Sequence, residues 1–302
     1  MALPSANENA FLGVIVGVAI GDALGLPVDG MTANDIRSMH GAFEGYLELQ
    51  GMPEGQPTKG VISDKTEIML SIIESMTTNE AVIDPENINA RLGFVIESPT
   101  RMWMSDAVVS GIQAALENDG LVPDSFASTP EASLLVRGIP VGLRHSIGEP
   151  DTRALLEDAR LAAGLTHSDE DSVQLLAQVA EATAIAARHV DRVPDWKNHL
   201  TLRSGHPLSE RISAVVDGVL AAETFEEAVL PVVRQGGDAS ALGAVAGGIA
   251  GARFGAAGLP QQFIDDLDAR IYLSMAAPWF YRTILRQQGI VVDLHMADQF
   301  PG

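Results

Sequence analysis

Two stretches of the chain carry a glycine at every fourth position: Gly13-Val-Ile-Val-Gly17-Val-Ala-Ile-Gly21-Asp-Ala-Leu-Gly25 and Gly243-Ala-Val-Ala-Gly247-Gly-Ile-Ala-Gly251-Ala-Arg-Phe-Gly255. Residues four apart lie along one face of an α-helix. A glycine inside a helix costs about 1 kcal/mol relative to alanine, so these two rows require a compensating interaction. Close packing of one backbone on another supplies it. The spacing predicts two central helices in close backbone contact, with each other as one candidate pairing.

The rest of the chain favours an all-α fold in a single domain spanning 1–302. Hydrophobic residues make up 46% of the sequence but aromatic residues only 5%, which suits closely packed helices better than a β-sandwich. Apolar residues recur with helical periodicity in ten segments. These segments are 7–24, 65–78, 86–97, 104–118, 152–163, 168–190, 207–222, 224–235, 240–255 and 260–274. Only Phe43–Leu49 and Ile290–Leu294 suggest short extended pieces.

Charge and cysteine content exclude several classes of function. The chain has 19 Lys and Arg against 40 Asp and Glu, a formal charge of −21, and no basic cluster, so we expect no nucleic-acid partner. It has no cysteine, which excludes disulfides and thiolate chemistry and favours a cytoplasmic location. The apolar segments Phe11–Ile20 and Ala241–Ala252 are shorter than the ~20 residues of a membrane span. We therefore expect buried helices and no membrane partner.

Acidic residues lie where the glycine rows end and at one further helix start. The first row runs into Gly21-Asp-Ala-Leu-Gly25-Leu-Pro-Val-Asp29, and the second follows Gly236-Gly-Asp-Ala-Ser-Ala241. The third acidic segment is Ser63-Asp-Lys-Thr66. These segments, in this order, resemble the ADP-ribosylglycohydrolase family. Thr166-His167 and Arg137-Gly-Ile-Pro140 are similar to two further family segments, although the Asn-Gly that usually precedes the latter is absent.

The resemblance spans about residues 10 to 275 and implies a compact, orthogonal multi-helix fold. Members of the family hold two Mg²⁺ or Mn²⁺ ions at the base of an ADP-ribose cleft and cleave an N- or O-glycosidic bond at the ribose. Hard divalent cations of this kind prefer carboxylate and hydroxyl ligands. The resemblance therefore implies a small ribosyl or ADP-ribosyl substrate, or an ADP-ribosylated protein.

The metal ligands of the family are only partly present. Carried over by position, Ser63, Asp64 and Asp238 remain, while Lys65, Ser240 and Ala241 stand where the family has two carboxylates and a threonine. The two lost carboxylates make the site three charges more positive, and two divalent ions would bring four. We therefore expect one Mg²⁺ ion or none, with the Lys65 ammonium occupying or blocking a metal position. Its expected partners are Asp64, Asp238 or Asp22.

The resemblance also assigns roles to individual residues. It implies catalytic roles for Asp29, Asp64, Lys65 and Asp238, and ligand-binding roles for Asp22, Arg137, His167, Gly236, Gly237 and Ser240. Asp29 stands where the family has a glutamate, one methylene longer. The residues also allow structural roles: Asp64 and Asp238 as helix caps, Asp22 as a backbone acceptor and His167 as a packed side chain. Carboxylates around Lys65 would raise its pKa, which argues against a nucleophilic amine.

Three functions remain open from the sequence. The first is a glycosidic-bond hydrolase with a degraded two-metal site. The second is a non-catalytic relative that binds ADP-ribose, another nucleotide or a protein. The third is new chemistry on a different small substrate in the same cleft.

Overall fold

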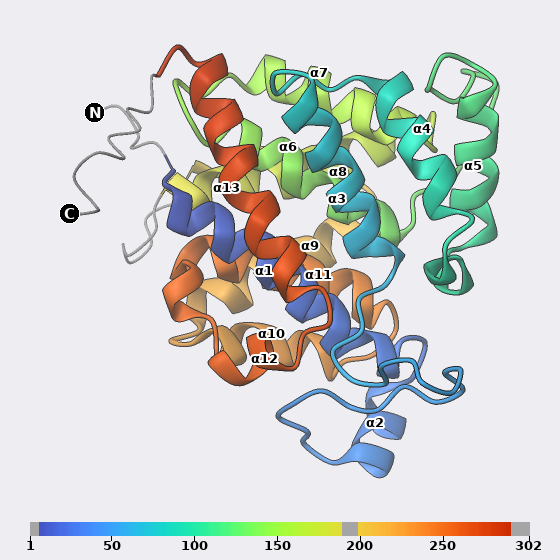
Figure 1. The fold of residues 1–302 in the computed structure, drawn as a ribbon, viewed down its shortest axis with the longest axis vertical. Coiled ribbons are helices and arrows are strands. Elements are labelled where there is room, and N and C mark those ends of the chain that lie inside the picture. The colour runs from blue at the N-terminus through green and yellow to red at the C-terminus, as the bar shows by residue number, and fades with distance from the viewer. Residues whose placement is uncertain (1–5, 189–198, 291–302) are drawn as a thin grey trace, which may run out of the picture.

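The computed structural model describes residues 6–188 and 199–290, and α-helices make up most of this part of the chain (Figure 1). The helices are α1 (Glu8–Gly25), α2 (Ala33–His40), α3 (Asp64–Thr78), α4 (Pro85–Val95), α5 (Asp106–Leu116), α6 (Gly138–Arg144), α7 (Thr152–Gly164), α8 (Glu170–Arg188), α9 (Pro207–Ala221), α10 (Phe225–Val233), α11 (Ala239–Phe254), α12 (Gln261–Asp265) and α13 (Arg270–Gln287). Short 3₁₀ turns are η1 (Leu26–Val28), η2 (Pro99–Trp103), η3 (Ala132–Arg137) and η5 (Ala256–Gly258). Within the described residues the extended pairing is confined to one isolated bridge, between Thr32 and Gly236. The all-α prediction is confirmed.

The two glycine rows pack directly against each other along α1 and α11, which confirms the predicted pairing. A Cβ atom added to Gly17 would lie 2.2 Å from the carbonyl oxygen of Gly247, and one added to Gly21 would lie 1.9 Å from that of Gly243. Gly13 meets Gly251 in the same way, so the helices run antiparallel. Figure 1 shows α1 crossing the middle of the molecule with the other helices around it.

Helix α1 is longer than the apolar segment expected from the sequence. Together with η1 it forms a helical stretch from Glu8 to Val28 that is apolar and long enough to cross a membrane by length and composition alone. Of its most apolar window, 89% is buried inside this protein. Its surroundings are α11 along the glycine row and α13, where Phe11 packs 5.8 Å from Phe280 between ring centroids.

A further glycine contact, between α6 and α8, was not predicted. A Cβ atom on Gly138 would lie 2.6 Å from the Leu176 carbonyl oxygen, and one on Gly142 would lie 2.4 Å from that of Ala180. Helix α6 has only seven residues and includes Pro140 as well as these glycines, so its sequence has weak helical propensity. Its packing on α8 overrides that propensity.

Other boundaries differ from the predicted ones. The predicted helix 260–274 is wrong: α12 ends at Asp265, and α13 then runs from Arg270 to Gln287 through Pro278. The short helix α2 was also missed. No strand forms at residues 43–49, where the Leu49 N–H donates to Thr58 O at 2.8 Å. The last residues of the predicted segments 168–190 and 290–294 lie outside the described residues.

Candidate functional site

Asp22 is fully buried near the end of α1 and connects that helix to the start of α3. Its carboxylate accepts hydrogen bonds from Ser63 N–H at 2.8 Å, Ser63 Oγ at 2.7 Å and Thr66 Oγ1 at 2.6 Å. Burial raises the pKa of Asp22, whereas the donors from Thr66 and Ser63 oppose that rise. The carboxylate is therefore used to fix α3 against the glycine-packed pair α1 and α11.

Ser63 is the N-cap of α3, and its hydroxyl is already engaged. Its Oγ donates to Asp22 and accepts the Lys65 backbone N–H at 3.2 Å. Asp64 is the first residue of the helix rather than its cap, so the structural role considered for it from the sequence does not apply. Its side chain therefore does not cap the helix.

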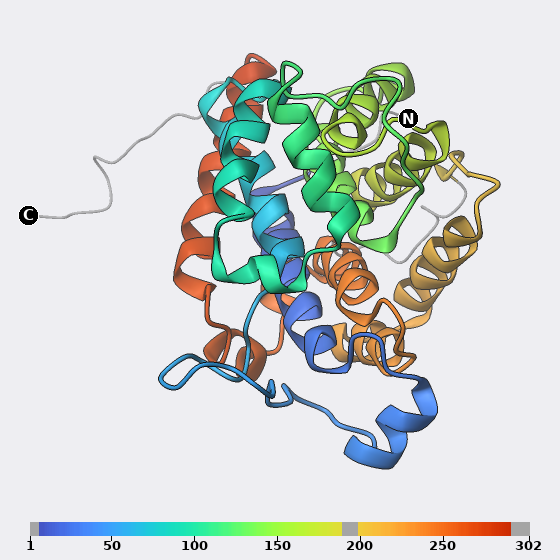
Figure 2. The same ribbon diagram turned by 90° about the vertical axis from the view of Figure 1, so that its right-hand side faces the viewer.

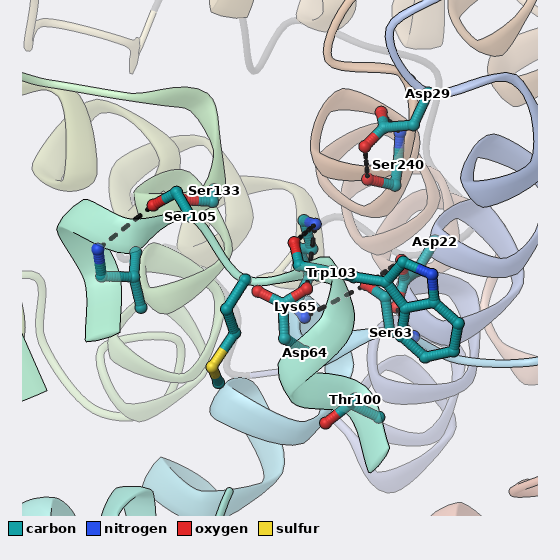
Figure 3. Close-up of polar contacts among 12 residues, drawn as sticks. Asp22, Asp29, Ser63, Asp64, Lys65, Thr100, Trp103, Ser105, Ser133 and Ser240 are labelled. Carbon is teal, nitrogen blue, oxygen red and sulfur yellow. Dashed lines mark hydrogen bonds and ion pairs between the residues drawn. The ribbon is translucent and has the colours of Figure 1, made fainter. Parts of the chain in front are cut away.

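Asp64 and Lys65 form a buried ion pair at the start of α3 (Figure 3). Lys65 Nζ donates to Asp64 Oδ1 at 2.9 Å and to the backbone oxygen of Trp103 at 3.4 Å. The Lys65 side chain is only 6% exposed and that of Asp64 only 1%. The second oxygen of Asp64, Oδ2, is buried and has no hydrogen-bond partner among the described residues.

The pKa values of both side chains in this pair are shifted. Burial raises the pKa of Asp64 to about 6, against the opposing effect of the Lys65 charge. Burial alone would lower the pKa of Lys65, but the carboxylates of Asp64 and Asp22 outweigh it and the pKa is raised. Asp29 adds to the same effect. Lys65 is therefore an ammonium ion at neutral pH, which disfavours a nucleophilic amine.

Asp29 caps the start of α11, because the residue that directly precedes this helix makes no capping hydrogen bond. Ser240 N–H donates to Asp29 Oδ1 and Ser240 Oγ donates to Asp29 Oδ2, both at 2.9 Å. Figure 3 shows this pair apart from the cluster around Lys65 and Asp64. A carboxylate at a helix N-terminus is favoured by the free N–H groups and the helix dipole.

Asp238 turns away from the helix that follows it. It makes no capping hydrogen bond, and its Oδ2 pairs with Arg211 Nη1 from α9. The side chains are 50% and 39% exposed, respectively. The cap role considered for Asp238 from the sequence is therefore wrong, because Asp29 satisfies the start of α11 instead.

Gly236 and Gly237 form the turn before α11. Their φ angles are +72° and +64°, in the left-handed region that favours glycine. The Gly237 N–H donates to Met31 O at 2.8 Å, and Gly30 N–H donates to Gly237 O at 2.7 Å. The turn thereby holds the loop that carries Asp29 beside the start of α11.

Arg137 is fully buried and connects to His167 through Thr166. Arg137 Nη1 donates to Thr166 Oγ1 at 2.5 Å, and that oxygen lies 2.7 Å from His167 Nδ1. Burial, aided by the charge of Arg137, lowers the pKa of His167 to about 4, so the imidazole is neutral at physiological pH. Burial likewise lowers the pKa of Arg137 to about 10. Arg137 Nε and Nη2 have no partner among the described residues.

The side chains do not fit a two-ion centre in this arrangement. Residues 6–188 and 199–290 contain no group of three or more His, Asp or Glu side chains placed to hold a metal ion. Ser63 is occupied by Asp22, Asp64 Oδ1 by Lys65, and Asp238 by Arg211. Among the buried oxygens of the predicted ligands, Asp64 Oδ2 has no hydrogen-bond partner within the described residues.

Two residues at the site were missed from the sequence. Trp103, at the end of η2, supplies a backbone acceptor for Lys65 and lies beside it in Figure 3. Arg211 neutralises Asp238 from a helix that carries no motif. A single tryptophan or arginine has no spacing signal, so only the tertiary structure reveals these contacts.

Comparisons with known proteins agree with this architecture. The chain is 26% identical to an uncharacterized protein of Archaeoglobus fulgidus, over 92% of this chain and 98% of that one. It is 25% identical to an ADP-ribosyl-[dinitrogen reductase] glycohydrolase of Rhodospirillum rubrum, over 90% of this chain and 94% of that one. A solved structure described as an ADP-ribosylglycohydrolase-related protein complex superposes with a TM-score of 0.67 at 22% identity, over 92% of this chain and 98% of that one. The ADP-ribosylglycohydrolase family model matches residues 3–290, and the chain belongs to that family.

Proposed function

We propose that this protein hydrolyses a ribosyl N- or O-glycosidic bond, with the Lys65 ammonium in place of a metal ion. The observation that carries the proposal is the position of Lys65 Nζ, buried and 2.9 Å from Asp64 Oδ1, in the motif where the family holds metal. Membership of a glycohydrolase family supports the reaction class. Family membership does not bear on the replacement of a metal ion by Lys65, which is the part that we add.

Electrostatics support an ammonium in this role. A metal ion in such a site stabilises negative charge and orients oxygen ligands. Lys65 can supply positive charge without an ion, because the neighbouring carboxylates keep it protonated. An ammonium has three N–H donors. One donates to Asp64, and a second donates to the Trp103 carbonyl oxygen. The third is free to donate to a substrate oxygen.

Asp64 Oδ2 is the proposed acceptor for the substrate side. It is a buried carboxylate oxygen without a partner among the described residues, and leaving such an oxygen unpaired is costly. A ribose hydroxyl or an attacking water would satisfy it. Asp29, which is exposed, is the second carboxylate proposed near the reacting bond. The substrate class is a small ribosyl or ADP-ribosyl compound, or an ADP-ribosylated protein.

A non-catalytic relative that binds ADP-ribose or another nucleotide is the second candidate. The observation that favours it is the pairing of Asp238 with Arg211, which leaves one of the acidic motifs without a convergent carboxylate. This candidate shares the binding step with the first and lacks the hydrolysis.

Calorimetric titration of ADP-ribose into chelator-treated protein, with and without Mg²⁺, tests the lysine substitution. We expect equal binding in both conditions, followed by release of ADP-ribose from an ADP-ribosylated protein without added metal. Binding that requires Mg²⁺ would overturn the substitution. Binding without hydrolysis would select the non-catalytic candidate, and absence of binding would exclude both.

Two sets of variants sharpen the test. Lys65→Met should lower turnover by about 10²-fold or more, as removal of a preorganised electrostatic group does. Lys59→Met is the matched control, because the Lys59 side chain is 53% exposed and pairs only with Glu48. Restoring the family's ligand types with Lys65→Asp, Ser240→Asp and Ala241→Thr should make ADP-ribose binding respond to Mg²⁺.

A further inference from the structure

Helix α13 exposes a straight row of large apolar side chains. Ile271, Met275 and Trp279 are 70%, 56% and 61% exposed, and they lie four residues apart on one face of the helix. The opposite face, with Leu273, Ala277 and Phe280, is buried against the core. Figures 1 and 2 show α13 on the outside of the molecule. We call the three exposed residues the α13 row.

Charges are arranged in opposite senses at the two ends of this row. Before the helix, Asp265, Asp266 and Asp268 are exposed. The helix itself, residues 270–287, contains no acidic residue. Arg270 opens it and offsets one of these three charges, and Arg282 and Arg286 follow the row near its end, where Arg282 pairs with Glu8 at 3.9 Å. The row therefore runs from an acidic end to a basic end.

We propose that the α13 row is the contact surface for a second copy of this chain, with the two helices antiparallel and the two-fold axis beside Met275. This arrangement places Ile271 opposite the partner's Trp279. It also places Arg282 opposite the partner's Asp268, and Arg286 close to the partner's Asp265. A two-fold contact of this kind is self-complementary, because each pair occurs twice. A crossing angle of about 20° keeps the helices close along the whole row.

Charge selects a second copy in antiparallel orientation over a parallel one. A parallel pair would bring the acidic ends together and the basic ends together, which costs free energy. The formal charge of −21 on each chain also opposes association over most of the surface. The acid-free helix is where two such molecules can approach with the least repulsion.

The surface beside the row can receive a side chain. A hollow of about 320 Å³ lies next to it, lined in part by Ile73, Thr77, Tyr272 and Trp279. Tyr272 Oη donates to Glu74, which also pairs with Arg91 at 2.8 Å, so the carboxylate in this hollow is already compensated. Ile271 of the second copy can therefore pack beside Trp279 without an unpaired charge nearby.

Cysteine cross-linking tests the geometry directly, because the chain has no cysteine of its own. Met275→Cys should form a covalent dimer on mild oxidation, since position 275 meets its own copy at the axis. Met39→Cys is the matched control: Met39 is 70% exposed on α2, away from the row. An equimolar mixture of Ile271→Cys and Trp279→Cys chains should cross-link at least 10-fold faster than either variant alone. Cross-linking of Met275→Cys no faster than the control would overturn the proposal.

The mass in solution provides a second, independent measurement. Sedimentation equilibrium of the full chain should give twice the 31.9 kDa chain mass at sufficient concentration. Arg282→Glu should weaken the dimer about 10-fold, and Asp268→Arg added to it should restore the affinity by exchanging the two charges. A monomer at every concentration would overturn the proposal, as expected if another protein or residues 291–302 covered the row. The proposal would also be overturned if the double variant dimerised no more tightly than Arg282→Glu alone.

Discussion

The glycine contact between α1 and α11 and the polar cluster between the end of α1 and the start of α3 lie next to each other but are specified in different ways. Along the contact, Gly17 and Gly247 matter because they lack side chains, and a single added Cβ would meet a carbonyl oxygen. At the end, Asp22 and Lys65 matter for their charges, which a neighbour can neutralise in several arrangements. Steric exclusion leaves one packing, whereas charge compensation leaves several. The packing of the scaffold therefore tolerates fewer substitutions than the charged cluster beside it.

The largest effect should follow from adding one methyl group to the glycine contact. In Gly17→Ala the new Cβ would lie 2.2 Å from the Gly247 carbonyl oxygen, so the two helix backbones must separate. Overpacking of a core usually costs 1–3 kcal/mol, and a backbone-to-backbone clash should cost about 3 kcal/mol or more. Urea unfolding of the variant and of the wild type measures this cost as a difference in unfolding free energy.

Gly218→Ala is the matched control for that variant. Gly218 lies in α9 with nothing within 4 Å of an added Cβ, so alanine should stabilise the protein by about 0.5–1 kcal/mol through helix propensity. Equal stability of Gly17→Ala and the wild type would show that the close contact is not required.

The next largest effect on folding stability comes from the polar cluster and depends on pH. Burial raises the pKa of Asp64 from 3.8 to about 6, so the folded protein binds a proton that the unfolded chain releases between these values. The contribution of Asp64 to stability is therefore fully present below about pH 4 and is lost as pH rises through about 6. In free energy this rise in pKa corresponds to about 3 kcal/mol.

Asp64→Asn isolates this contribution from that of His167, which has the opposite sign. The pKa of His167 is lowered to about 4, so its contribution is present above the usual histidine value of 6.5 and is lost as pH falls toward 4. The asparagine variant keeps His167 unchanged. The difference in unfolding free energy between wild type and variant should fall by about 2 kcal/mol from pH 4 to pH 7.5. A constant difference across this range would contradict the raised pKa of Asp64.

Much of the fold was predictable from spacing because packing of helices depends on periodic features. The rows at Gly13 and Gly243 predicted the central pair, and helical periodicity located most of the other helices. Helix α6 was missed because Gly138, Pro140 and Gly142 lower its helix propensity, and only its contact with α8 explains them. The boundary before α13 was wrong because Pro278 lies inside that helix.

The site was predictable only in part because hydrogen-bond partners come from distant segments. The sequence placed Asp22 near the end of one helix and Ser63 at the start of another, and the structure joins them through two hydrogen bonds that were not predicted. It also named Asp64 as a partner of Lys65, which the structure contains. It could not show that Asp29 caps α11, because that contact spans 211 positions of the chain. The metal content and the catalytic roles of these residues stay predictions.

The smallest effect on stability should come from Arg211→Ala, which removes the partner of Asp238. The two side chains are 39% and 50% exposed, and exposed ion pairs usually contribute 0–1 kcal/mol, so we expect a loss of about 0.5 kcal/mol or less in urea unfolding. Arg91→Ala, which removes the partner of Glu74 in a more buried pair with side chains 30% and 35% exposed, is the matched comparison and should cost more. Because Arg211→Ala frees the Asp238 carboxylate while leaving Lys65 in place, it also separates the two residues that would oppose metal binding under the proposed function. If Arg211 alone withheld the ligand, Mg²⁺ would bind to this variant, whereas obstruction by Lys65 predicts no binding until Lys65 is also replaced.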